Sequence, residues 1–303
     1  MQTPEELYEE THNRFGPDNI LSDDEMKTLH SHMKDVYLRL AMVPYTKSSP
    51  YRNRVMQEFA DKTTDAGLFP VEVSEKEHLQ GADLVLGNHQ GPSDGIGKGG
   101  FESLLVWAGM PPNTSVVMKH ELLQFRWSIK EAIQSIVYNR ANPIPFVRPE
   151  GEGAQYGKGL VNECRRVSKE VARTITEDDM TVLMYPEGQR SPNGKVLQFK
   201  PALLHGIVEN YIEPAITEGE TPRIALAVSD TLSTMPNGYG KKAPIYKFPY
   251  KIEGIPFDPG GLVAAVQEGE STRKVTNMLA TDARRSVEEK LFSMIQHTLS
   301  NTP

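Results

Sequence analysis

A histidine and an aspartate stand five residues apart in the segment 88–94, which has the sequence Asn-His-Gln-Gly-Pro-Ser-Asp and follows a short apolar run. In a pair such as His89 and Asp94, the carboxylate can accept the Nδ1 proton of the imidazole, which fixes the tautomer and leaves Nε2 free as a base. A turn in which the aspartate only caps the main chain has the same spacing. The residues alone therefore leave a base dyad and an ordinary turn open as alternatives.

A second polar segment, residues 185–191, has the sequence Tyr-Pro-Glu-Gly-Gln-Arg-Ser and also follows an apolar run. Arg190 offers a bidentate fork for a phosphate, and Lys200, a few residues on, offers a point charge. Gly188 lets the main chain approach a ligand closely. Taken alone, this segment is equally well explained as a surface turn with solvated cations.

Together the two segments resemble the glycerolipid acyltransferase superfamily, the family of lysophosphatidate and glycerol-3-phosphate acyltransferases. The first motif of that family, Asn-His followed by four residues and Asp, is matched by Asn88, His89 and Asp94. Its third motif, Phe-Pro-Glu-Gly-Thr-Arg-Ser, is matched by residues 185–191, with Tyr for Phe and Gln for Thr.

Three looser matches lie between and after these motifs in the family's order: Lys119-His-Glu121-Leu, residues 144–148 ending in Arg148, and Phe199-Lys200. The resemblance covers about residues 83–230. The sequence departs from the family where residues 224–228 carry Ala in place of a proline, and where Ala202 replaces a glycine. These departures concern the identity of the acceptor more than the chemistry.

The resemblance implies an O-acyltransferase of phospholipid biosynthesis. The enzyme would move a fatty acyl group from coenzyme A or acyl carrier protein to a hydroxyl of glycerol-3-phosphate or 1-acylglycerol-3-phosphate. His89 would take the proton of that hydroxyl and Asp94 would orient His89, so that neither a metal nor another cofactor is needed. The substrate-binding residues that the resemblance implies are Glu187, Gly188, Arg190, Ser191, Lys200, Arg148, Lys119 and Glu121.

Two alternatives keep the same fold with another function. A non-catalytic lipid-binding protein would have no need of a base, so an intact pair of His89 and Asp94 argues against it. An acyl-thioester hydrolase would use water in place of the hydroxyl, and a phosphate site built from Arg190 and Lys200 disfavours it.

Short apolar runs that alternate with segments at helical spacing must position these residues. We expect strands near 84–86, 115–118, 144–147, 181–185 and 223–228, and helices near 100–109, 121–137, 157–176 and 201–216. This alternation is typical of an α/β fold with a mixed, mainly parallel sheet flanked by helices. In such sheets, ligands bind where loops leave the carboxyl ends of the strands, which is where both polar segments fall.

The first 75 residues have a different pattern and are expected to form an N-terminal helical portion, ahead of an acyltransferase domain over residues 76–303. Ser22 and Glu25 form a capping-box pattern. Apolar residues then recur at helical spacing up to residue 40, and a second helix is expected near 51–66. We interpret the apolar stripe of the 22–40 helix as a core face, with a membrane-lying helix as the alternative. One or two further helices are expected at the carboxyl end.

Composition narrows the function classes. The 303 residues carry 33 basic and 40 acidic side chains, a net charge of −7, and this acidic balance argues against a nucleic-acid partner. A single cysteine excludes a disulfide framework and a Cys-rich zinc site. The sequence shows neither a signal-peptide pattern nor a membrane-spanning apolar run, so we expect a cytoplasmic protein. Peripheral contact with a membrane would use the 22–40 helix or the lysines between 241 and 251.

Overall fold

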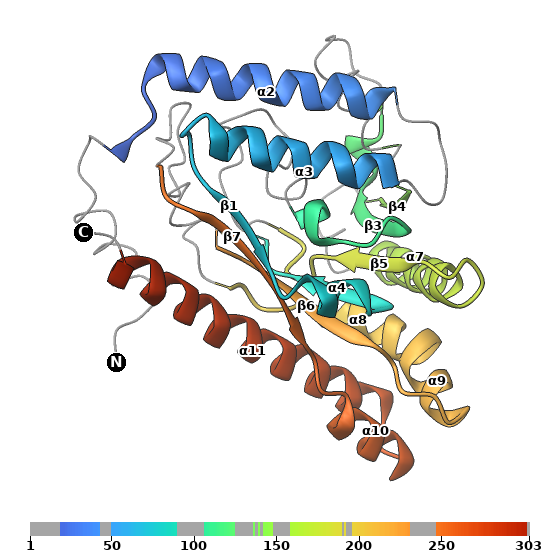
Figure 1. Cartoon of the computed structure of the whole chain (residues 1–303). Helices are drawn as coiled ribbons and strands as arrows, with labels where there is room; N and C mark the ends of the chain where they lie inside the picture. Colours follow the sequence, from blue (N-terminus) through green and yellow to red (C-terminus); the bar gives the residue numbers. More distant parts are fainter. Residues whose placement is uncertain are drawn as a thin grey trace.

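A seven-stranded sheet forms the centre of the computed structural model, in the order β1-β7-β6-β2-β5-β3-β4 (Figure 1). The structure describes residues 19–42, 50–89, 106–124, 136, 139, 142–147, 158–189, 191, 196–230 and 247–301. Neighbouring strands are parallel except for β6 and β7. The predicted α/β class with a mixed, mainly parallel sheet is confirmed. The strands are β1 (Val71–Ser74), β2 (Leu84–Gly87), β3 (Thr114–Lys119), β4 (Pro143–Phe146), β5 (Thr181–Met184), β6 (Ile224–Asp230) and β7 (Tyr250–Pro256).

Helices cover both faces of this sheet. One face packs against α7 (Lys158–Thr176), α8 (Pro201–Ile207), α10 (Gly260–Gln267) and α11 (Thr272–Asn301). The other face packs against α2 (Asp23–Ala41), α3 (Pro50–Asp65) and α4 (Lys76–Gln80). Figure 1 shows α2 and α3 side by side on one side of the sheet and α11 running along the other.

Alternation along β2 explains how one short strand serves two cores. Leu84 and Leu86 are buried against α7, α8 and α11, whereas Val85 is buried on the opposite face with α2 and α3. Successive side chains of a strand point to opposite faces, so a strand buried on both sides must be apolar at every position. This is why the run was recognisable in the sequence.

The two N-terminal helices match their predicted positions. The Ser22 hydroxyl accepts the Glu25 N–H at 3.3 Å and the Ser22 N–H donates to Glu25 Oε2 at 2.8 Å, which confirms the capping box. The apolar stripe of α2 is buried, so its interpretation as a core face is confirmed. Because α2 and α3 share this core with the sheet, the predicted division at residue 75 stays a prediction.

Strands β1 and β7 were not predicted. β1 is a four-residue edge strand whose side chains alternate between exposed and half-buried, so it lacks the continuous apolar run that marks a central strand. Further helical segments among the described residues include a 3₁₀ turn (His120–Leu122), a π turn (Val208–Ile212), α9 (Glu213–Thr217) and residues 106–109, the described part of the helix predicted over 100–109. Most of the helix predicted over 121–137 lies outside the described residues. No described helix combines the length and the apolar character needed to cross a bilayer.

Candidate active site

Three chain segments meet at the carboxyl ends of the central strands. β2 lies between β6 and β5 and runs parallel to both. Asn88 and His89 follow β2, residues 185–191 follow β5, and Ser229 lies at the end of β6. Parallel strands end at the same edge of a sheet. The two motif segments of the sequence are therefore neighbours in the fold.

Asn88 fixes the exit of β2 to the end of β6. Its side chain is fully buried. Asn88 Nδ2 donates to the carbonyl oxygen of Ser229 at 2.9 Å, and Asn88 Oδ1 accepts the Ser229 N–H at 2.8 Å. Both polar atoms of the amide are thus used on one residue of the neighbouring strand, which satisfies a buried polar group in place of water.

Glu187 bonds to the main chain after β2 from the β5 side. Its carboxylate is fully buried. Glu187 Oε1 accepts the main-chain N–H of His89 at 2.9 Å, and Oε2 accepts the N–H of Leu197 at 3.0 Å. In addition, the Ser191 N–H donates to the carbonyl oxygen of His89 at 2.8 Å. The main chain of His89 is therefore bonded on both its N–H and its C=O by the segment after β5.

The imidazole of His89 is half-buried and stacks on Tyr185. The ring centroids lie 4.6 Å apart and the ring planes meet at 27°. Tyr185 also passes close over Gly87, because a Cβ built on Gly87 would lie 2.8 Å from Tyr185 Cε1. Only glycine at position 87 leaves room for the aromatic ring that supports the histidine.

Lys200 lies over the turn that contains Gly188. Gly188 has a φ of 67°, which favours glycine, and a Cβ built there would lie 3.4 Å from Lys200 Nζ. The Lys200 N–H donates to the carbonyl oxygen of Pro186 at 2.9 Å, and its side chain is exposed. An exposed ammonium group therefore stands on the same turn that binds the His89 main chain.

The other predicted residues are placed only in part. Lys119 is exposed at the end of β3, two strands from β2 and thus about 10 Å to the side at the usual strand spacing. Asp94, Arg148 and Arg190 lie outside the described residues, as does the side chain of Glu121. The pairing of His89 with Asp94 accordingly stays a prediction.

The residue before Arg148 is nevertheless anchored. The Val147 N–H donates to Glu163 Oε1 of α7 at 2.7 Å, and Arg166 donates to the same carboxylate at 2.6 Å. The Arg166 guanidinium lowers the pKa of Glu163, which keeps this carboxylate ionised as an acceptor. A second carboxylate on this edge therefore holds the end of a strand, here β4.

Sequence reasoning missed what Asn88, Glu187 and Ser229 do. Asn88 appeared only as part of a motif, and Glu187 was expected at the acceptor. The bonds of Asn88 and Glu187 join residues 141 and 98 positions apart, a separation that no local spacing reveals. The one available signal was the occurrence of Asn and Glu directly beside buried strands, where a polar side chain needs a partner.

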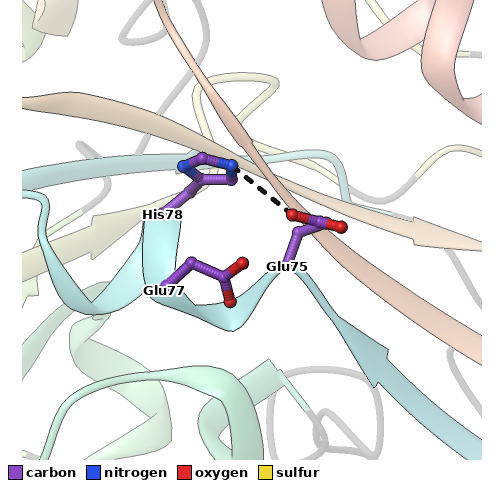
Figure 2. A group of neighbouring side chains, drawn as sticks. All are labelled: Glu75, Glu77 and His78. Carbon is purple, nitrogen blue, oxygen red and sulfur yellow. Dashed lines mark ion pairs between the residues drawn. The ribbon is translucent and has the colours of Figure 1, made fainter.

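Cys164 and the metal-ligand residue types lie elsewhere. Cys164 is buried on α7, and burial raises the pKa of its thiol. Among the residues that the structure describes, one cluster has metal-ligand chemistry: Glu75, Glu77 and His78, at and beside α4 (Figure 2). It lies beyond the end of β1, which runs opposite to β2, and so at the other end of the sheet from His89. Glu75 and Glu77 are exposed.

Part of the chain that contains this site matches a known protein family. The family model described as Acyltransferase matches residues 70–217, which run from β1 to α9 and include Asn88, His89 and Glu187. Residues 70–217, just under half of the chain, are therefore similar to the acyltransferase family. The resemblance to the glycerolipid acyltransferases that the motifs indicated is confirmed.

The chain is also similar to two curated proteins and to one solved structure. Two curated proteins named 1-acyl-sn-glycerol-3-phosphate acyltransferase, from Limnanthes alba and Limnanthes douglasii, are each 25% identical over 154 residues. Those residues are 50% of this chain and 46% of each relative, so the match spans about half the length of the curated relatives. A solved structure of the 1-acyl-sn-glycerophosphate acyltransferase PlsC from Thermotoga maritima has a TM-score of 0.44 and 16% identity over 84% of this chain and 95% of that chain.

Proposed function

We propose that this protein transfers a fatty acyl group from a thioester to a hydroxyl of a phosphate-bearing glycerol or lysophospholipid, 1-acylglycerol-3-phosphate or glycerol-3-phosphate. The observation that carries the proposal is the bonding of the His89 main chain to the segment after β5. This contact places a candidate base beside the turn over which Lys200 lies. The match of residues 70–217 to the acyltransferase family supports the reaction class.

The proposed step needs a base because a hydroxyl is a weak nucleophile at neutral pH. His89 takes the proton of the acceptor hydroxyl as its oxygen attacks the thioester carbonyl, and Asp94 orients the imidazole. The carbon–sulfur bond then breaks and the thiolate leaves with a proton from the imidazolium. The products are an ester and a free thiol, so that no metal, further cofactor or acyl-enzyme is needed.

The acceptor phosphate would be held by Arg190, Lys200 and Arg148, which positions its hydroxyl beside His89. Gly188 would shape this site, and Ser191, Lys119 and Glu121 are the remaining candidate substrate-binding residues. The donor would be acyl-coenzyme A or acyl carrier protein. The Limnanthes relatives, named as 1-acyl-sn-glycerol-3-phosphate acyltransferases, support a lysophosphatidate-like acceptor.

Thiol release from an acyl thioester, measured with and without candidate acceptors, tests this function. Transfer predicts thiol release that depends on 1-acylglycerol-3-phosphate or glycerol-3-phosphate. Release of equal size without any acceptor would identify a hydrolase. Binding of the lipid without thiol release would identify a lipid-binding protein, and either of these results would overturn the proposal.

We further propose that the protein works in the cytoplasm with weak peripheral contact to a membrane. Two observations limit the contact: the apolar face of α2 is buried, and the charge of −7 repels anionic lipid. Lys247 is paired with Glu25, and Lys251 donates to Thr298. Lys241 and Lys242 lie outside the described residues. We therefore expect binding to anionic vesicles only at low salt.

A vesicle co-sedimentation series in rising salt checks this expectation. Attachment that survives high salt would show that an apolar surface inserts instead. Leu38 and Met42, which are 42% and 72% exposed on α2 and just after it, are the side chains to substitute in that case.

A further inference from the structure

We propose that Asn88 and Glu187 are positioning residues for His89 that contact neither substrate. Glu187 bonds to the His89 main-chain N–H from the β5 side, and Asn88 bonds to the end of β6 one residue before His89. The inference rests on the proposed function, because it takes His89 to be the base. It differs from the acceptor-binding role that the family resemblance implies for Glu187.

Both oxygens of the Glu187 carboxylate bond to the main chain. Each oxygen accepts a main-chain N–H, from His89 at 2.9 Å and from Leu197 at 3.0 Å, and the side chain has no exposed surface. A substrate phosphate would also be repelled by this carboxylate at close range. The group is thus suited to holding two loops together, one carrying His89 and the other leading to Lys200.

Asn88 makes a corresponding pair of main-chain hydrogen bonds on the β6 side. Its amide gives one donor and one acceptor to the main chain of Ser229, with both residues fully buried. β6 and β2 are already paired up to Ala227 and Gly87. The amide of Asn88 therefore continues the attachment of the two strands one step beyond the ladder, at the residue that precedes His89.

Both Asn88 and Glu187 are sensitive to isosteric changes, because their hydrogen bonds depend on which side-chain atoms donate and which accept. In Asn88→Asp the donor to the Ser229 carbonyl becomes a second acceptor, so two oxygens face each other. In Glu187→Gln an NH₂ group replaces one oxygen and faces a main-chain N–H. Each change keeps the size of the side chain and breaks one bond, at a site where buried polar groups without partners are costly.

Steady-state kinetics on Asn88→Asp and Glu187→Gln, together with hydrogen exchange at the His89 amide, test the proposal. We expect kcat to fall by about 10- to 100-fold, because a displacement of about 1 Å at the reacting group can have an effect of that size. The KM values for acceptor and donor should stay within about twofold. Amide exchange at His89 should become faster in Glu187→Gln.

Asp83→Asn is the matched control. Asp83 directly precedes β2 at its other end, where it accepts hydrogen bonds from Tyr211 and Arg223. This substitution is also isosteric and also breaks a polar contact of β2. It should lower stability while kcat and the exchange at His89 stay as in the wild type, which separates positioning from a general loss of stability.

Three results would overturn the proposal. A raised acceptor KM with unchanged kcat in Glu187→Gln would mean that Glu187 contacts the acceptor. Unchanged kcat in both variants would mean that neither residue positions the base. If the variants do not fold, hydrogen exchange at the His89 amide of the wild type still tests the proposal. This amide should exchange slowly, and fast exchange would contradict its bond to Glu187. Because hydrogen exchange is measured without substrate, this test of the His89–Glu187 bond remains valid even if the protein transfers no acyl group.

Discussion

The two ends of β2 are held in different ways. Before the strand, the Asp83 carboxylate accepts hydrogen bonds from the Tyr211 hydroxyl at 2.9 Å and from Arg223 Nε at 3.1 Å, and the Arg223 side chain is 64% exposed. After the strand, Asn88 and Glu187 are fully buried and bond to main-chain groups. One end pairs side chains with each other in partial contact with water, and the other end places buried polar side chains around the main chain of a histidine.

This difference indicates which end is built for stability and which for chemistry. A partly hydrated ion pair tolerates substitution and contributes modestly to the stability of the fold. A buried carboxylate destabilises the fold unless each of its oxygens accepts a hydrogen bond. Such groups occur where a fixed geometry matters. We infer that the polar side chains after β2 serve the geometry of His89, while those before β2 only secure the strand.

Removing the imidazole should have the largest effect. His89→Ala is expected to lower kcat by about 10²- to 10⁴-fold, the usual range for loss of a general base. The side chain is only half-buried, so the unfolding temperature should change little. Kinetics and thermal unfolding on the same preparation check this. Near-normal turnover in a folded variant would remove His89 from the mechanism.

Displacing Tyr185, the ring on which the His89 imidazole stacks, should have the next largest effect. In Gly87→Ala the new Cβ would lie 2.8 Å from Tyr185 Cε1, so the tyrosine ring on which His89 stacks must shift. We expect kcat to fall by up to about 10²-fold through misplacement of the base.

Gly109→Ala is the control for this change. Its Cβ would be similarly crowded, 2.9 Å from Val73 Cγ1, but the contact lies against β1 and not beside His89. Equal losses of kcat in Gly87→Ala and Gly109→Ala would show that crowding of the fold, rather than displacement of His89, causes the effect.

Removing the candidate phosphate-binding cations should have a smaller effect, mainly on acceptor binding. Arg190→Ala and Lys200→Ala are each expected to raise the acceptor KM by about tenfold, with a smaller change in kcat, if these side chains hold the phosphate. Arg190→Lys should recover only part of the affinity, because the fork geometry is lost. A raised donor KM with an unchanged acceptor KM would move the phosphate site to the donor.

The smallest effect is expected before β2. Tyr211→Phe removes one hydrogen bond to Asp83 and should lower the free energy of unfolding by about 0.5–1.5 kcal/mol. Acyl transfer should be unchanged, since this contact lies at the opposite end of the strand from His89. Denaturant titration and a transfer assay measure the two quantities, and reduced kcat in a stable variant would contradict the division between the two ends.

The sequence predicted those parts of the fold whose physical signal is local. β2 and β5 are buried on both faces, so their apolar runs were visible, as was the capping box at Ser22. β1 and β7 were not, because β1 is short and at the edge, and β7 alternates between buried and half-exposed side chains over most of its length. Local patterns cannot reveal a strand that depends mainly on its neighbour.

The same limit applies to the site. His89 and the segment after β5 were recognisable as chemistry-bearing residue types, and the fold brings them together. The bonds of Asn88 to Ser229 and of Glu187 to His89 depend on strand order, and side-chain bonds to distant main-chain groups leave no spacing in the sequence. The predicted roles of Asp94, Arg148 and Arg190 stay predictions, since these residues lie outside the part of the chain that the structure describes.

A panel of acceptors assayed with one radiolabelled acyl thioester, using the wild type and His89→Ala side by side, tests base-catalysed acyl transfer most directly. We expect labelled product from a phosphate-bearing acceptor, one free thiol for each labelled ester, and a loss of both in His89→Ala. Labelled product formed equally well by His89→Ala, or thiol released without any labelled ester, would contradict acyl transfer by a base at the carboxyl end of β2.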